Sequence, residues 1–204
     1  MKWTLPAAGL VLAIALVGCA PVVEESERPT PTPTASVSNA ELVPGSTLDR
    51  SAITAAVPDG AALSVVAPSD AGEEERAALA AVQDAAIRHG AAVQVHAEAD
   101  PVAAVTAALA EHADVVVGIG PAAVGALDRA SAANLDVSFL LLGTQLAEPT
   151  GNVIAVTWPG AEERAVFAED PAPFSGGAAY AGAALEIGLA TFASGLGGHV
   201  IALD

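Results

Sequence analysis

The most constraining feature of the sequence is an apolar run at its centre. Residues 115–120 read V-V-V-G-I-G, with no polar side chain. A short run of β-branched residues is typical of a strand covered on both faces, as in a parallel sheet. We expect further strands at residues 63–67, 93–97, 137–142, 153–158 and 199–203. Because helical patterns separate most of these runs, the sequence predicts alternating strands and helices.

The helical patterns carry recognisable ends. The first helix is expected over residues 71–89, with Asp70 as its N-cap, Glu73 as the capping-box partner and Gly90 at the C-terminal end. The second begins at Asp100-Pro101, because aspartate caps a helix and proline is tolerated in its first turn. The third is expected over residues 121–133. The expected buried residues of the three helices are Leu79, Val82 and Ala86; Val102, Val105 and Leu109; and Val124 and Leu127.

These patterns predict the fold class. It is α/β, a three-layer, doubly wound and mainly parallel sheet of five to six strands. Right-handed crossovers place the turns that follow the strands at one end of such a sheet. Ligands bind outside the carboxyl ends of the strands, where the strand order reverses. We therefore expect a ligand crevice between the turns after the first and third strands.

The N-terminus has the features of an export signal. Lys2 precedes an apolar stretch over residues 5–17, which is too short for a stable membrane span. Leu16-Val17-Gly18-Cys19 then resembles the lipobox of bacterial lipoproteins. The resemblance implies cleavage after residue 18, a diacylglycerol thioether on Cys19 with further acylation such as palmitate, and anchoring on the outer face of the cytoplasmic membrane. The alternative is an ordinary signal peptide with an incidental cysteine.

The next segment is expected to be a flexible tether over residues 19–57. Prolines and threonines alternate in residues 29–34, and alternating proline favours an extended, solvated backbone. Serine, threonine and glycine continue beyond it, a composition that buries little apolar surface. The sequence leaves open whether the threonines are glycosylated. Residues 58–204 then form the single α/β lobe.

Charge excludes several classes of partner. The chain has 24 acidic and 7 basic residues, a net charge of −17 at pH 7, and its only lysine is Lys2. A nucleic acid is not expected as a partner, because binding of phosphates requires clustered cations. Anionic lipid headgroups would repel the lobe, so the lipid on Cys19 must provide the anchor. Cys19 is also the only cysteine, which leaves no disulfide within the chain.

Four stretches resemble a known family. They are residues 114–120, the run Asp136-Val137-Ser138-Phe139, the pair Asn152-Val153, and residues 180–185 followed by Gly197-Gly198-His199-Val200. Their order is similar to the first lobe of a type I periplasmic-binding protein, and more narrowly to the basic-membrane-protein or PnrA-like lipoproteins. This resemblance implies a solute-binding component of an ABC importer, with a small neutral ligand such as a nucleoside.

The chain departs from the family pattern in two ways. Ser69-Asp70-Ala71-Gly72 stands where the family has an aspartate, a serine and an aromatic–asparagine pair, and Pro121 replaces an aromatic residue. The sequence also ends where the second lobe of the family begins, so we expect half of the ligand cage. The sequence leaves open whether another chain supplies the second lobe. The expected ligand-lining residues are Ser69, Asp70, Gly118, Gly120, Pro121, Gly143, Thr144, Thr157 and Trp158.

Several of these residues have structural alternatives. The glycines also suit tight strand-to-helix turns, Asp70 also suits a helix cap, and Trp158 suits either ligand stacking or packing under the C-terminal helix. No catalytic constellation, cofactor motif or metal-ligand spacing is present in the sequence. His89, His96, His112 and His199 are expected at the surface or at helix ends.

The C-terminal segment leaves two hypotheses open. Residues 174–196 are apolar, but Glu186 in their middle disfavours membrane insertion, so we expect a helix docked on the lobe. The first hypothesis is a non-enzymatic, lipid-anchored binding module, with a small molecule and an ABC permease as partners. The alternative is an envelope interaction lipoprotein that has lost its ligand and self-associates, or binds a partner, through this segment.

Overall fold

The structure is a computed structural model, and it describes residues 43–160 and 173–204. The predicted signal peptide, Cys19 and most of the predicted tether lie outside these residues. The described chain forms a six-stranded sheet in the order β2-β1-β3-β4-β5-β6, with every neighbouring pair parallel. The strands are β1 (Ala62–Val66), β2 (Ala92–His96), β3 (Val115–Ile119), β4 (Ser138–Leu142), β5 (Val153–Thr157) and β6 (His199–Ala202). The predicted fold class is confirmed.

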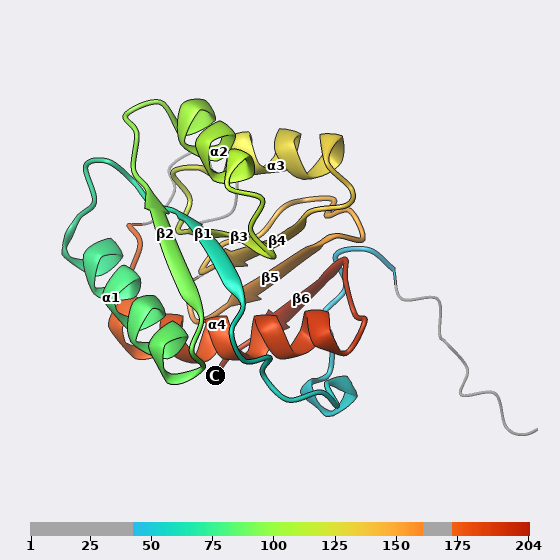
Figure 1. The fold of residues 1–204 in the computed structure, drawn as a ribbon. Coiled ribbons are helices and arrows are strands. Elements are labelled where there is room, and N and C mark those ends of the chain that lie inside the picture. The colour runs from blue at the N-terminus through green and yellow to red at the C-terminus, as the bar shows by residue number, and fades with distance from the viewer. Residues whose placement is uncertain (1–42, 161–172) are drawn as a thin grey trace, which may run out of the picture. The chain divides into compact units, whose positions relative to one another are not determined.

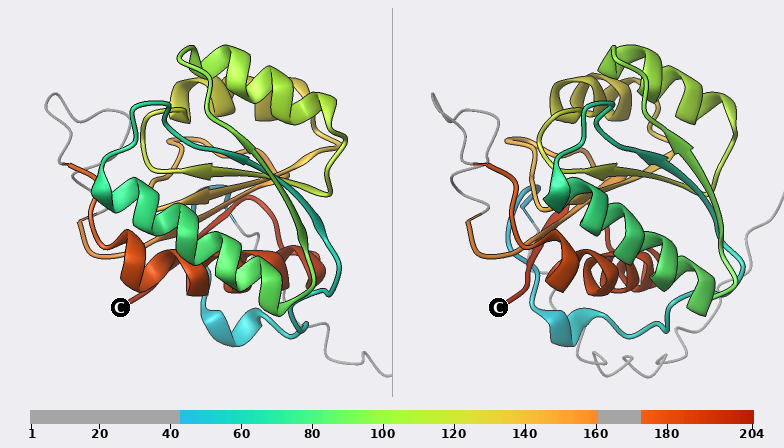
Figure 2. Two further views of the ribbon diagram at one scale, coloured as in Figure 1. Left: turned by 60° about the vertical axis from the view of Figure 1, so that its left-hand side comes forward. Right: turned by 90° about the vertical axis from the view of Figure 1, so that its left-hand side faces the viewer.

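Helices cover both faces of the sheet. One face carries α1 (Glu73–Arg88) and α4 (Gly177–Ala193), and the other carries α2 (Pro101–Ala110) and α3 (Val124–Ala133), as Figures 1 and 2 show. Two hydrophobic clusters correspond to the two faces. Every residue of β3 and β5 is buried, as expected for central strands between two helical layers.

The helices α1 and α4 approach each other closely because glycine stands at their contact. A Cβ on Gly177 would lie 2.5 Å from the carbonyl oxygen of Glu74, and one on Gly182 would lie 3.2 Å from that of Ala81. The C-terminal segment thus docks on the lobe as a helix, as the sequence predicted. No helix among the described residues is long and apolar enough to cross a membrane.

Three local predictions are wrong. The N-cap of α1 is Gly72, without a side-chain cap bond, so Asp70 does not form the capping box. The helix α3 begins at Val124 rather than Pro121, because a tight turn in which the Val124 amide donates to the Pro121 carbonyl precedes it. Val102 is 49% exposed, although the pattern placed it on the buried face of α2. By contrast, the prediction that Asp100 caps α2 is confirmed, because its carboxylate accepts a hydrogen bond from the Val102 amide.

The N-terminal arm, residues 45–55, packs on the lobe. The Gly45 amide donates to Gly198 at 2.8 Å and the Leu48 amide donates to Val200 at 2.8 Å, alongside the outer edge of β6. Farther along, the amides of residues 54 and 55 donate to the Ser194 hydroxyl at the end of α4. The prediction that a flexible tether continues to residue 57 is therefore wrong for the arm.

Candidate functional site

The strand order places the reversal point between β1 and β3. The chain moves from β1 outward to β2, then returns past β1 to β3 and continues to β6 on the other side. The loops after β1 and β3 consequently leave the sheet toward opposite helical layers. In open parallel sheets this divergence opens a crevice that binds ligands. The crevice predicted from the sequence is at this position.

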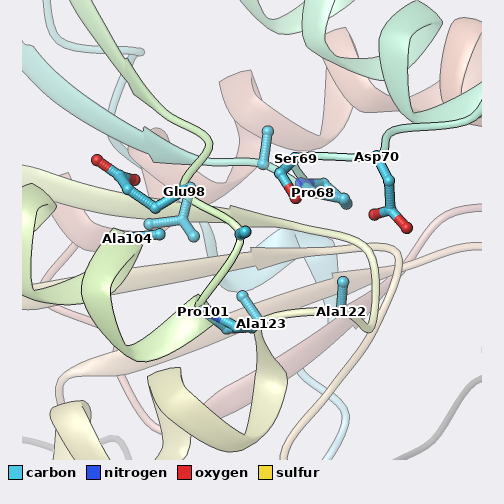
Figure 3. A pocket seen from close by; sticks show the side chains of 11 residues that line it. Pro68, Ser69, Asp70, Glu98, Pro101, Ala104, Ala122 and Ala123 are labelled. Carbon is cyan, nitrogen blue, oxygen red and sulfur yellow. The ribbon is translucent and has the colours of Figure 1, made fainter.

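A small pocket occupies the crevice (Figure 3). Its volume is about 50 Å³, and it lies at the carboxyl ends of β1, β2 and β3. The loop after β1 forms one wall, the turn before α3 faces it, and the first turn of α2 closes a third side. The lining residues are Val66, Ala67, Pro68, Ser69, Asp70, Glu98, Ala99, Pro101, Ala104, Ala122 and Ala123.

Ser69 and Asp70 are the two predicted residues that line the pocket. Both are exposed, and neither has a hydrogen bond to another described residue that fixes its side chain. Because Gly72 takes the N-cap position of α1, the Asp70 carboxylate is free of the capping role that competed with ligand binding. Figure 3 shows the Glu98 side chain directed away from Asp70. The polar groups of the pocket therefore concentrate on the loop after β1.

Gly118 inside β3 and Gly120 directly after it serve packing and turn geometry. A Cβ on Gly118 would collide with the Leu127 side chain, which α3 places against the strand. Gly120 has a φ of +69°, a conformation that favours glycine, and lies against the Phe174 ring. Pro121 is beside the pocket but does not line it. Gly118 thus serves packing of α3 on the sheet, whereas Gly120 and Pro121 belong to the turn, and none of the three lines the pocket.

An aromatic cluster fills the carboxyl ends of β4 and β5. Trp158 is only 3% exposed, stacks on Tyr180 at 5.8 Å between ring centroids, and meets the edge of Phe174 at 5.7 Å. Its indole nitrogen donates to the Ser175 carbonyl at 2.7 Å. Of the two roles weighed for Trp158, the structure shows packing under the C-terminal helix. Gly143, with a φ of +73°, leaves room for the rings of this cluster.

The two predicted threonines are buried near the same cluster. Thr157 donates to the Ile201 carbonyl at 3.4 Å, which ties β5 to β6. Thr144 is completely buried, and its hydroxyl has no hydrogen-bond partner among the described residues. Gly143, Thr144, Thr157 and Trp158 therefore do not line the pocket. The predicted set divides into an open part beside β1 and a packed part beside β4 and β5.

The pocket residues contributed by the segments at the start of α2 and α3 are not marked by any sequence motif. Glu98, Ala99, Pro101 and Ala104 precede or begin α2, and Ala122 and Ala123 lie in the turn before α3. Apart from Glu98 they are small or cyclic residues, which shape a surface without polar recognition groups. Only their position after β2 and β3 in a parallel sheet could have indicated this role.

Two histidines lie in unexpected environments. His96 and His199 are buried, at the end of β2 and the start of β6, although surface or capping positions were predicted. The burial of His199 follows from the arm, whose Ser46 hydroxyl lies 3.4 Å from its Nδ1 atom. His89 is the C-cap of α1, as expected for a helix-end role. Within the two described segments, no group of three or more potential ligands is placed to hold a metal ion.

Comparisons with known proteins match solved structures to about half of this chain. No protein-family model and no curated protein sequence matches the chain. A candidate lipoprotein fragment from Peptoclostridium difficile 630 is 11% identical over 51% of this chain and 88% of its own, with a TM-score of 0.44. A solute-binding protein of an ABC transporter system from Aeropyrum pernix K1 is 17% identical over 52% of this chain and 30% of its own, with a TM-score of 0.43.

A third structure with partial similarity is the Lac repressor dimer bound to operator and an anti-inducer. It is 22% identical over 48% of this chain and 36% of its own, with a TM-score of 0.39. The similar part spans only about a third of the solute-binding protein and of the repressor. These similarities are too weak to assign a family, and membership of the basic-membrane-protein family is not confirmed. The fold assignment depends on the strand order and the two helical layers themselves.

Proposed function

We propose that this protein is a lipid-anchored, extracytoplasmic binding module that holds a small neutral ligand at the reversal point of its sheet. The observation that carries this proposal is the pocket at the carboxyl ends of β1, β2 and β3. It coincides with the crevice that the topology provides for ligands. Two of its polar side chains, Ser69 and Asp70, make no hydrogen bond within the described residues and are free to bind a ligand.

The groups that line the pocket favour recognition over catalysis. They include the Ser69 hydroxyl and the carboxylates of Asp70 and Glu98, but no histidine, lysine or cysteine. No hydrogen bond in the described structure joins the Ser69 hydroxyl to either carboxylate, and a hydroxyl that no base activates is a poor nucleophile, whereas hydroxyls and carboxylates bind hydroxyl or amide groups of a ligand well. We therefore propose a binding role and no enzymatic activity.

The small volume limits how much of a ligand the lobe encloses. At about 50 Å³ the pocket is far below the ~300–1,000 Å³ that encloses a small molecule. It suits one polar portion, such as the ribose hydroxyls of a nucleoside, while the remainder of the ligand lies outside. A second protein surface would complete the site, and an ABC permease or another subunit is the partner we propose.

The membrane anchor is a separate part of the proposal. Cys19 would carry the lipid and hold the lobe on the outer face of the cytoplasmic membrane of a bacterium. Labelling of cells with an alkyne-tagged palmitate should mark the wild-type chain and not the Cys19→Ser variant, which should leave the membrane fraction. A labelled Cys19→Ser variant would contradict lipidation at this residue.

Ligand binding is tested by calorimetric titration of the full chain with a panel of nucleosides. We expect at least one nucleoside to bind, and Asp70→Asn to weaken binding about tenfold, the effect of losing one charge-assisted hydrogen bond. Asp84→Asn is the matched control, because Asp84 is an exposed carboxylate on α1 outside the pocket. Absence of heat with every nucleoside would overturn the proposed ligand class, and an equal effect of both variants would overturn the proposed site.

One observation favours the alternative function, an interaction lipoprotein without a ligand. The aromatic cluster of Trp158, Phe174 and Tyr180 fills the part of the crevice beside β4 and β5, where a ligand would otherwise contact Thr144. Light scattering during size-exclusion chromatography of the full chain in detergent discriminates between the two functions. A dimer that forms without ligand supports the alternative, and a monomer that binds a nucleoside supports the binding module.

A further inference from the structure

The surface helix α2 lacks charged residues. Its sequence over Pro101–Ala110 is P-V-A-A-V-T-A-A-L-A, in a chain with 24 acidic and 7 basic residues. Ala104, Val105 and Ala108 face the core, but the outward side carries the exposed residues Val102, Ala103, Thr106 and Ala110, of which only Thr106 is polar. A solvent-facing helix normally presents charged or polar residues on its outer face. This outer face therefore resembles a surface that another molecule covers.

A groove separates α2 from α3. Its volume is about 250 Å³, and it lies on the helical layer opposite α1 and α4. Where glycines bring α1 and α4 together, the facing side chains of α2 and α3 are valine, leucine and alanine, which leave a channel between the helices. The lining residues are Val102, Val105, Thr106, Leu109, Ala126, Arg129, Ala130 and Asn134.

Arg129 is the only charged residue among those that line the groove. Three other arginines in the described chain bond within the protein: Arg50 to Asp204, Arg88 to Glu186 and Arg76 to the Ala71 carbonyl. Arg129 makes no hydrogen bond or ion pair in the described segments. The groove thus combines five apolar lining residues with the neutral polar Thr106 and Asn134, an unpaired guanidinium and no carboxylate, although acidic residues dominate the whole chain.

We propose that this groove binds an amphipathic helix of a partner protein, with aliphatic side chains in the groove and a carboxylate paired with Arg129. Helices in grooves present anchors at spacings of three and four residues, which match a channel between two parallel helices. A guanidinium pairs with a carboxylate through two parallel hydrogen bonds, so Arg129 would fix the register of the partner. This docking surface does not depend on the proposed ligand pocket.

A helical protein segment suits the groove better than a small molecule, a membrane surface or a second copy of the chain. Exposed residues, Val102, Thr106 and Arg129, line it, so it is open to solvent, whereas small-molecule sites enclose most of the ligand surface. An anionic membrane would be repelled by the net charge of −17. A second copy of the chain carries the same net charge, and its α2–α3 face would present another unpaired Arg129 rather than a carboxylate.

Selection of displayed peptides on the full chain in mild detergent tests the proposal. The probes are a library of 16-residue, helix-forming peptides, with counter-selection against the Val102→Asp variant. We expect enriched peptides with aliphatic residues three or four positions apart and a nearby glutamate or aspartate. Fluorescence anisotropy should show at least tenfold weaker binding to Arg129→Glu, and weaker binding when the carboxylate of the peptide is replaced by an amide. Ile87→Asp, at a 73% exposed residue on α1, is the control and should leave binding unchanged.

Every other result overturns the proposal. Failure to enrich any peptide, or enrichment of basic peptides, would exclude the proposed partner chemistry. Equal binding to wild-type and Arg129→Glu chains would exclude the pairing role. A dimer by light scattering that Val102→Asp dissociates would assign the groove to a second copy, and calorimetric binding of decanoate that Val102→Asp removes would assign it to a small amphiphile. Circular dichroism of each variant establishes that its fold is intact.

Discussion

At the residue scale, Glu186 connects three segments of the chain. Its Oε1 atom accepts from Arg88 Nη2 at 2.8 Å and lies 3.3 Å from His89 Nε2, so α4 is joined to the end of α1. The other ring nitrogen of His89 lies 3.8 Å from Asp59 in the loop before β1. Partial burial acts to raise the pKa of Glu186, but the hydrogen bonds and charges of Arg88 and His89 outweigh it and lower the pKa.

The lowered pKa of Glu186 predicts a pH-dependent contribution to stability. A carboxyl whose folded-state pKa is depressed stabilises the fold above its unfolded value, about 4.5, and loses this effect as the pH falls through the folded value. We expect Glu186→Gln to lower the free energy of unfolding by about 0.5–1 kcal/mol at pH 7, the scale of a partly exposed ion pair. Urea denaturation at pH 7 and pH 3 measures the free energy of unfolding of the wild-type chain and of Glu186→Gln. The same difference between the two proteins at both pH values would contradict the prediction.

The role of Asn152 depends on contacts that only the tertiary structure shows. The family resemblance singled it out before the fifth strand. In the structure its amide nitrogen lies 3.1, 3.0 and 2.9 Å from the carbonyl oxygens of Ser131, Asn134 and Val137. It thereby joins the loop before β5 to the turn between α3 and β4. Asn152 and Gly118 both belong to stretches that resemble the family, and both have a structural role in this protein.

At the scale of elements, the two helical layers differ in how tightly they pack. The α1–α4 layer is held together by glycine at the contact, whereas the α2–α3 layer leaves a groove. Sequence patterns predicted the four α-helices and six strands of the described residues, with their starts within a few residues of those observed, although no end was predicted for α2. The patterns could not predict which helices share a layer, because that depends on the strand order and the hand of each crossover.

The contact at Gly177 predicts a large effect of a single methyl group. A Cβ there would lie 2.5 Å from the Glu74 carbonyl oxygen and 2.7 Å from the Ala78 Cβ, so Gly177→Ala must move α4 away from α1. We expect a loss of about 1–3 kcal/mol in the free energy of unfolding, as for other overpacked cores.

Gly125→Ala in α3 is the control, because its Cβ has open space except for Arg129 Nη1 at 3.9 Å. Alanine should stabilise α3 by up to about 1 kcal/mol. Thermal unfolding compares the two variants, and an equal response would contradict this packing argument.

At the scale of the whole lobe, the N-terminal arm and the C-terminal strand depend on each other. The arm lies along β6, the last strand of the sheet, and covers an edge that would otherwise expose backbone donors and acceptors. Arg50 in the arm also pairs with Asp204 at 2.9 Å. The lobe therefore begins before residue 58, the boundary that composition suggested.

The side chain that anchors the arm is Leu48, which is 6% exposed within the α1–α4 core cluster. We expect Leu48→Ala in the full chain to lower the free energy of unfolding by about 2–4 kcal/mol, as for other buried leucines. Val43→Ala, at a 65% exposed residue just before the arm, should change it by less than about 0.5 kcal/mol. Hydrogen exchange of the Leu48 amide provides a second readout. Rapid exchange in the wild-type chain would show that the arm is detached.

The sequence by itself determined the alternation of strands and helices, the parallel sheet and the end of the sheet where we propose a ligand site, because apolar periodicity and helix-end residues are local properties. The tertiary structure decided how that site is divided. Ser69 and Asp70 after β1 are left open, whereas Trp158, Phe174 and Tyr180 pack at the ends of β4 and β5. It also placed the arm beside β6 and left Arg129 unpaired in its groove. These contacts join residues far apart in the chain, and local patterns carry no information about them.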